Sequence, residues 1–566
     1  MFPDSKIAQA MTIKRTKASY VMQHGVAREE KLAVVETCRK QKFSLIIDES
    51  TDISVSQILA IAVRFYDEEK QKVLDVLLDA VEVEDGTGEG LYIAVTNLLR
   101  SFGIPLQNIV GFASDNCSTM MGVNSGFQAF LKRDIPSVFI LGCICHSFAL
   151  CASHACRNLP SYLESFLKNV CSYFARSSKR QHLFRLIQDV VHAPKHKILK
   201  LCQTRWLSRG NVIARVLEQW EALTLFFQSE APSDKVDGAG EIYQTFVNAG
   251  TKHMLLFLNY VLSKVDSMNT EFQSEQFRLH KVHSVISDEY RSILGMFITS
   301  NTMSTQSLSA IDPADERLHK DLKSIDLGGR CESMLLKQSL GDETRFRSDA
   351  RSFLVDLCVQ IRMRFPLAED SILSLLKVLD PHEAMSQGNR TQSIIKLASY
   401  FPTLVAEQQM DDLQDQWRAL PSFRSSLEHA TNLPPCSFWH EIRSIKDGLG
   451  RMKFCLLSKF MSDLLVLPHS SACVERIFSQ VNIVKNEHTN CLKAETVVNR
   501  LLAKQALSRQ NAKCHTWHPS KSLINDVQHG QCHARYIDSE RKRKEQNGIV
   551  VHDVDEIDCV QTMRFD

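Results

Sequence analysis

The hydrophobic pattern divides the chain into a strand-forming region and a helical region. Between residues 43 and 143, short runs rich in Val and Ile alternate with turn residues, which is typical of buried strands. Two stretches in the same region repeat their apolar residues at helical spacing. The predicted order is β-β-β-α-β-α-β, with strands at 43–47, 58–66, 73–83, 109–113 and 138–141 and helices at 89–102 and 126–133.

The connections between these elements predict how the strands pair. Strands joined by tight turns pair antiparallel, whereas a strand, helix, strand unit makes a right-handed crossover between parallel strands. The first three strands are therefore expected to form a meander, with the fourth parallel beside the first. Functional side chains of such sheets collect beyond the carboxyl ends of parallel strands. Asp48 follows the first strand and Asp115 follows the fourth, so two carboxylates are expected side by side.

From residue 146 onward the apolar spacing is helical. The most regular amphipathic stretches are 162–191, 212–228, 246–265 and 343–365. The segment 231–240 (APSDKVDGAG) has the composition of a linker. No strand-like alternation occurs from there to about residue 453, and the chain after Lys513 is polar and weakly patterned.

Composition narrows the classes of partner. The 67 Lys and Arg residues nearly balance the 65 Asp and Glu residues, so no chain-wide field attracts a polyanion and any basic site must be local. The most apolar stretch, 138–155, contains Cys, Ser and His and is too polar to span a membrane. The 17 cysteines, and an amino terminus without an apolar leader, predict reduced thiols in the cytosol or nucleus.

The two aspartates have two interpretations. Neighbouring carboxylates repel each other, and a divalent cation such as Mg²⁺ or Mn²⁺ is the usual reason to bring them together. A third carboxylate would complete a two-metal site. Alternatively, Asp48 and Asp115 simply cap the turns that follow their strands. Spacing alone favours capping.

A cluster of Cys and His residues follows the last predicted strand. Its spacing, CxCHxxxxCxxHxC from Cys143 to Cys156, contains neither of the usual paired-ligand halves of a zinc site. Cys is among the most often buried residue types, so we expect these side chains to pack in the core and predict no structural zinc.

Five motifs in a fixed order carry a family resemblance. They are IIDESTD, FASDNCSTMMG, CICHSFAL, TRWLSR and SSACVERIFSQVN. The series resembles the signature of hAT-superfamily DNA transposases and of vertebrate genes derived from them. DESTD and LKAETVVNRLLAKQA are most similar to host-domesticated proteins related to BED-finger transposases. The resemblance implies an α/β, RNase H-like fold interrupted by a large all-α insertion and completed by a helical hAT dimerisation region.

The resemblance also implies a catalytic triad. Asp48 and Asp115 match the first two acidic residues of the family's DDE triad, and Glu475 matches the third. The implied chemistry is phosphodiester cleavage and strand transfer, with Mg²⁺ or Mn²⁺ held by the same three carboxylates. Without the resemblance, Glu475 is interpreted as a first-turn glutamate stabilised by the helix dipole.

Further motifs imply contacts with DNA. Cys143 and His146 match the family's C-x-x-H element. Arg205 and Trp206 match its RW element, which is implicated in handling a flipped base, although a Trp in the core at a helix start is an equal alternative. Basic residues on one helical stretch predict a local DNA surface, or a solvated helix face: Arg176, Lys179, Arg180 and Arg185, followed by Lys195 and Lys197.

The carboxy-terminal helices suggest association. The family's dimerisation region corresponds to about 463–507, where Val497, Val498, Leu501 and Leu502 form one apolar stripe. A lone exposed helix would not leave such a stripe in water. The stripe predicts a homo-oligomer, or docking on the chain's own core.

The amino terminus departs from the family. Residues 1–42 contain only His24 and Cys38 as soft ligands, so the BED zinc finger of active relatives is expected to be missing. The basic run 541–544 is a candidate nuclear-localisation signal. The predicted parts are a helical remnant (1–42), the first part of the RNase H-like domain (43–230), the all-helical insertion (241–455), its completion with the dimerisation region (456–510) and a polar tail (511–566).

These observations predict a transposase-derived nuclear protein that acts through dimerisation and DNA association. The first alternative is an active, metal-dependent DNA transposase. The second is a helical scaffold with no nucleic-acid role. Neither a membrane nor a small-molecule substrate is expected.

Overall fold

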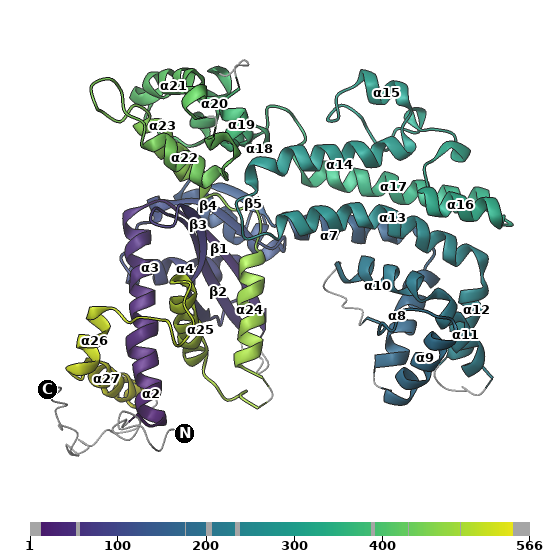
Figure 1. The fold of residues 1–566 in the computed structure, drawn as a ribbon, viewed down its shortest axis with the longest axis horizontal. Helices are drawn as coiled ribbons and strands as arrows, with labels where there is room; N and C mark the ends of the chain where they lie inside the picture. The colour runs from purple at the N-terminus through teal and green to yellow at the C-terminus, as the bar shows by residue number, and fades with distance from the viewer. Residues whose placement is uncertain are drawn as a thin grey trace. The chain divides into compact units, whose positions relative to one another are not determined.

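The structure is a computed structural model that describes residues 13–51, 57–175, 177–199, 207–232, 238–386, 391–427, 429–486 and 488–546 (Figure 1). The chain forms two compact units. The first joins residues 1–141 to 458–566, and the second comprises residues 142–457. A continuous helical segment therefore interrupts the α/β unit, as predicted, but residues 142–230 belong to the helical unit rather than to the first part of the α/β domain.

A five-stranded sheet forms the centre of the first unit. The strand order is β3-β2-β1-β4-β5. β1 pairs antiparallel with β2, β2 pairs antiparallel with β3, and β1 pairs parallel with β4. This topology confirms the predicted meander and the placement of the fourth strand beside the first. The bounds are β1 (Phe43–Thr51), β2 (Gln57–Asp67), β3 (Lys72–Glu82), β4 (Ile109–Ser114) and β5 (Phe139–Gly142).

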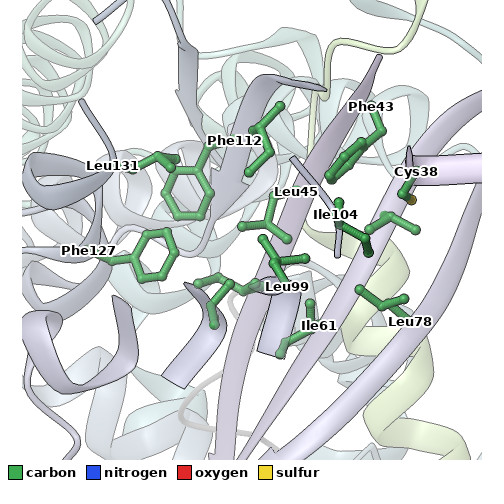
Figure 2. Close-up of a cluster of buried hydrophobic side chains, with 14 of the residues drawn as sticks. Cys38, Phe43, Leu45, Ile61, Leu78, Leu99, Ile104, Phe112, Phe127 and Leu131 are labelled. Carbon is green, nitrogen blue, oxygen red and sulfur yellow. The ribbon is translucent and has the colours of Figure 1, made fainter. Parts of the chain in front are cut away.

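One face of the sheet carries a large apolar core built from nearby sequence (Figure 2). Leu45, Ile61 and Phe112 project from β1, β2 and β4 into this cluster. They pack against α3 (Arg28–Lys40), α4 (Gly88–Ser101) and α6 (Phe127–Asp134). α4 begins where the Thr87 hydroxyl accepts a hydrogen bond from the Gly90 amide at 3.1 Å, an N-cap that satisfies one of its free amides.

The opposite face is covered by helices from the far end of the chain. α24 (Ala472–Val484) lies on β1 and β2, where Val474 and Cys473 contact Ile46, Ala60 and Ala62. α25 (Ala494–Arg509) lies beside it against β3. The alanines of β2 leave room for a helix to approach the sheet closely, because a larger side chain would hold it away.

The two chain ends of the first unit pack together. α2 (Arg15–Val21), a π-helix η1 (Met22–Ala27) and α3 follow one another, and the Tyr20 and Tyr536 rings stack at 5.8 Å. The carboxy-terminal region, whose sequence is polar and weakly patterned, forms α26 (Lys521–Gln528) and α27 (Gln531–Gln546). Leu523 and Cys532 are buried beside Gly25, a partner that local pattern does not reveal.

The second unit is built from helices. The predicted stretch 162–191 is interrupted near residue 177, because the Ser177 hydroxyl accepts a hydrogen bond from the Arg180 amide and starts a new helix. α7 packs against α13 and α17. The helices are α7 (Ile144–Ala155), α8 (Tyr162–Ala175), α9 (Ser178–Val190), α10 (Leu207–Glu218), α11 (Trp220–Glu230), α12 (Ala239–Val247), α13 (Ala249–Phe272), α14 (Val282–Phe297), α15 (Ser300–Thr305), α16 (Gly329–Lys337), α17 (Glu343–Arg364), α18 (Ile372–Leu375), α19 (Pro381–Ala384), α20 (Thr391–Tyr400), α21 (Met410–Ala419), α22 (Pro435–Arg443) and, across the boundary with the first unit, α23 (Cys455–Leu465).

Short 3-10 helices and two isolated β-bridges complete the fold. The bridges join Ile298 to His319 and Lys446 to Met452. Within the described ranges, no helix is both long and apolar enough to cross a membrane.

Candidate functional site

The pairing of β1 with β4 sets Asp48 and Asp115 at the same level. Ile46 is paired with Ala113 in the parallel register, and each aspartate lies two residues further along its strand direction. Side chains two residues apart project from the same face of a strand. Asp48 also pairs with Ala60 of β2, which contacts α24. Asp48 therefore lies on the face that α24 covers, and Asp115 follows the end of the neighbouring strand β4.

Glu475 lies in the first turn of α24, on the helix that packs over this face. The neighbouring Cys473 and Val474 are buried against the sheet, whereas Glu475 is exposed. Ser471, at the N-cap, makes no side-chain capping bond within the described part of the chain. A carboxylate in the first turn is favoured by the free amides of the helix start, so both interpretations of Glu475 fit its position.

The three carboxylates are not gathered into a metal-binding group as their side chains lie. Among the described residues, no set of three His, Cys, Asp or Glu side chains could hold a metal ion. Asp48 Oδ1 instead accepts a hydrogen bond from the Glu49 amide at 2.9 Å, and Asp115 Oδ1 accepts one from the Cys117 amide at 3.3 Å. Their oxygens have the chemistry that Mg²⁺ prefers, and each is engaged in the turn that follows its strand.

Two further side chains belong to this acidic edge. Burial and then the charge of Asp115 raise the pKa of Glu49 above its ordinary value. Burial, followed by a hydrogen bond to Asp115, raises the pKa of the Cys117 thiol to about 12. The motifs of the sequence analysis contain both residues, yet neither was singled out. The adjacent Asp48-Glu49 pair was the available signal for Glu49.

The Cys and His residues around α7 differ in burial and in their partners. Cys143 is buried at the N-cap and His146 is half-buried. Other members contact different helices: the Cys145 thiol donates to the Asn269 carbonyl at 3.6 Å, and His154 Nδ1 lies 2.6 Å from Asp356 Oδ2. Burial raises the pKa of Cys151 to about 12, which disfavours the thiolate that metals bind.

The predicted DNA-binding residues are only partly described. Arg176, Arg205 and Trp206 lie outside the described residues. Lys179 and Arg180 lie on α9, and the Arg180 guanidinium stacks 3.8 Å from the centre of the Tyr173 ring. Beside them is a small cavity of about 50 Å³ whose lining includes four basic side chains: Arg185, Lys195, His196 and Lys197.

The predicted dimerisation stripe faces the chain's own core. Val497, Val498, Leu501 and Leu502 are all at least nine-tenths buried and cluster with Ala27 and Leu77. A polar network adds to this contact: the Gln505 amide oxygen accepts from the Leu77 amide at 2.8 Å, and its nitrogen donates to the Leu77 carbonyl at 3.2 Å. In this structure the stripe therefore takes the second of its two predicted roles, docking on its own core.

Comparison with known proteins gives two family matches and a curated relative. Residues 5–126 match the model described as the ZMYM1/FAM200 RNase-like domain (DUF4371), and residues 412–507 match the hAT family C-terminal dimerisation region. General transcription factor II-I repeat domain-containing protein 2 of Bos taurus is 28% identical over 195 residues, which cover 33% of this chain and 20% of the relative. The match thus spans about a fifth of that relative's length. The two matches confirm the resemblance to hAT-derived proteins, and the first of them is to an RNase-like domain, in agreement with the five-stranded sheet.

Proposed function

We propose that the chain is a transposase-derived nuclear protein that acts by pairing with a second copy of itself and by contacting DNA. The observation that supports pairing is the match of residues 412–507 to a dimerisation region. The relative is named for the repeat domain of general transcription factor II-I, which supports a nuclear location, as does the basic run 541–544.

The surface for a second copy lies outside the buried stripe. Because Leu501 and its neighbours already fill the chain's own core, an approaching copy meets other apolar side chains of the matched region. Leu449 and Met452 of the second unit and Ile483 of the first are exposed by 77%, 51% and 72%. Each is a separate candidate contact, because large exposed apolar side chains are typical of interaction surfaces.

Analytical ultracentrifugation tests the pairing. The wild-type chain is expected to sediment as a dimer, and Ile483→Glu or Leu449→Glu to shift it toward the monomer, since a charge in an apolar interface must be desolvated. Ile537→Glu is the matched control, because Ile537 is 53% exposed but lies outside the matched region. A wild-type monomer at every concentration would contradict the proposal.

The basic cavity on α9 is the proposed contact with DNA. Replacing one cationic side chain that contacts a phosphate lowers the slope of log binding constant against log salt concentration by about one. Arg185→Gln is therefore expected to weaken binding to duplex DNA and to reduce that slope, while Lys446→Gln, an exposed cation elsewhere in the same unit, leaves both unchanged. Equal slopes for both variants would contradict a contact at this cavity.

A second candidate function, metal-dependent strand cleavage, is favoured by one observation. Asp48 on β1 and Asp115, directly after β4, each lie two residues beyond the paired Ile46 and Ala113, and α24, which bears Glu475, packs on β1. With Mg²⁺ or Mn²⁺ present, Asp48→Ala and Asp115→Ala are each expected to abolish nicking of supercoiled DNA. Glu82→Gln, an exposed carboxylate of β3, is expected to leave it intact. Nicking that persists in Asp48→Ala would rule out this function.

A further inference from the structure

A cavity of about 530 Å³ lies in the first unit, away from the acidic edge described above. Its walls come from α3, from the turn between β2 and β3, from the end of α25 and from the segment that precedes α26. Cavities of roughly 300–1,000 Å³ with a few polar groups are typical of ligand sites. This cavity therefore has the size to hold one or two residues of a peptide.

The segment after α25 is folded so that it presents a tryptophan to the cavity. Asn511 ends α25 in a left-handed conformation, with φ of 50°. The Trp517 amide then bonds the Lys513 carbonyl at 2.9 Å, closing a turn. Trp517 lines the cavity, and its indole nitrogen is buried with no hydrogen-bond partner among the described residues. An unmet buried donor is costly, and because this nitrogen is shielded from solvent, a ligand acceptor reaches it when the indole turns toward the cavity.

Arg509 supplies a second unmet donor in the same wall. Its Nη1 lies 3.1 Å from Glu30 Oε1 in a largely buried ion pair, but its Nε is buried without a partner in the described part of the chain. The pairing with Glu30 fixes the guanidinium in place. Two unmet donors can each take a carbonyl oxygen of a peptide backbone.

The charge of the cavity favours a cationic ligand. Four carboxylates line it against two cations. The cations are both engaged: Arg509 pairs with Glu30, and Lys70 lies 3.7 Å from Asp67. Glu29 and Glu69 remain without an ion pair among the described residues. A lysine or arginine side chain would pair with them and could also lie against the Trp517 ring.

We propose that this cavity binds a lysine or arginine residue of a peptide segment from a partner protein. The cationic side chain pairs with Glu29 and Glu69, and a backbone carbonyl accepts from Trp517 Nε1. The proposal is independent of pairing and of DNA contact, because it uses none of the residues assigned to either.

Isothermal titration calorimetry of the full chain tests the proposal with blocked pentapeptides, Gly-Gly-Lys-Gly-Gly and Gly-Gly-Arg-Gly-Gly. Both are expected to bind, and the norleucine analogue, which lacks the charge, is not. The double variant Glu29→Gln/Glu69→Gln is expected to weaken binding about tenfold, the usual scale for two partly exposed charge pairs. Trp517→Phe keeps a ring, removes the donor and is expected to weaken binding several-fold.

Glu36→Gln is the matched control. Glu36 is an exposed carboxylate of the same helix α3, it pairs with Lys40, and it does not line the cavity. Thermal unfolding of each variant verifies that it is folded. The Glu29→Gln/Glu69→Gln variant keeps the size and shape of both side chains, so it still tests the proposal if Trp517→Phe does not fold. Wild-type affinity in the double variant, or no binding of either basic peptide at millimolar concentration, would overturn the proposal. Butylammonium binding as tightly as the lysine peptide would overturn its peptide part.

Discussion

The two faces of the sheet in the first unit are closed in different ways. One face carries large side chains such as Leu45 and Phe112 and is covered by helices that lie within the first 134 residues (Figure 2). The other presents Ala60, Ala62 and Ala80 and is covered by α24 and α25, which begin at residues 472 and 494. The face closed by distant sequence is also the face that bears Asp48.

The difference shows how a helical insertion can sit inside an α/β unit. The face closed locally holds most of the apolar side chains, and burial of apolar area is the main source of stability. The face covered by α24 and α25 presents small residues, and hydrogen bonds help to hold these helices on it. The entropic cost of closing a loop rises only slowly with the length of the loop. The first unit therefore tolerates the helical unit that interrupts its sequence.

The largest expected effect is on the locally closed face. Phe112 is fully buried and its ring stacks on Phe127 at 4.9 Å. Phe112→Ala is expected to lower the free energy of unfolding of the first unit by about 3–5 kcal/mol, because it leaves a cavity in the core. Urea denaturation measures the loss. Ile93→Ala, at a side chain that is 50% exposed on α4, serves as the control, and a loss for Phe112→Ala no larger than the control's would show that this face is not the main core.

A smaller and more local effect is expected on the other face. Leu502 is fully buried between α25 and its neighbours, and Leu502→Ala is expected to cost about 2–5 kcal/mol. Hydrogen exchange should rise in α25 and η1 and stay unchanged in β4. Lys504→Ala changes an exposed position of the same helix and is expected to have little effect. Equal acceleration in β4 would mean that the two faces do not open separately.

The hydrogen bonds between α25 and the edge strand β3 are expected to contribute less to the free energy of unfolding. Gln505 bonds both backbone groups of Leu77 and donates to Glu30 Oε1 at 3.0 Å. Gln505→Ala leaves these groups unpaired and is expected to cost about 1–3 kcal/mol. Gln505→Glu should cost more, since it adds a charge beside Glu30. Unchanged urea midpoints for both variants would show that the apolar stripe alone holds α25.

The smallest effect is a shift of one titration at the acidic edge. Glu49 has a raised pKa because of burial and, second, because of Asp115. Asp115→Asn removes the second cause, so the pKa of Glu49 is expected to fall while staying above its ordinary value. A raised pKa means that the folded state favours the protonated carboxyl, so this contribution to stability is lost as the pH rises through the folded pKa. Carbon-detected NMR titration of labelled Glu measures the shift in the pKa of Glu49. An unchanged pKa would show that the charge of Asp115 does not act on Glu49.

The hydrophobic pattern of the sequence was sufficient to predict the strands and helices that pack against segments close to them in the chain. The five strands were predicted within about two residues at most of their ends, except that β1 extends through Asp48 to Thr51. It was not sufficient for α26 and α27, whose buried residues Leu523 and Cys532 meet Gly25 from the other end of the chain. Nor did apolar periodicity reveal that Ser177 would divide one long amphipathic stretch into two helices.

The sequence by itself determined the meander of the first three strands, the placement of the fourth strand beside the first and, through five ordered motifs, the resemblance to hAT transposases. The spacing of apolar residues identifies the strands, and the length of the connections between consecutive strands governs how they pair. Only the tertiary structure decided that α24 and α25 cover the alanine-lined face, that the stripe of Leu501 and Leu502 is used within the chain, and that Trp517 and Glu29 line one cavity. These outcomes depend on contacts between residues hundreds of positions apart, which apolar spacing along one segment does not record.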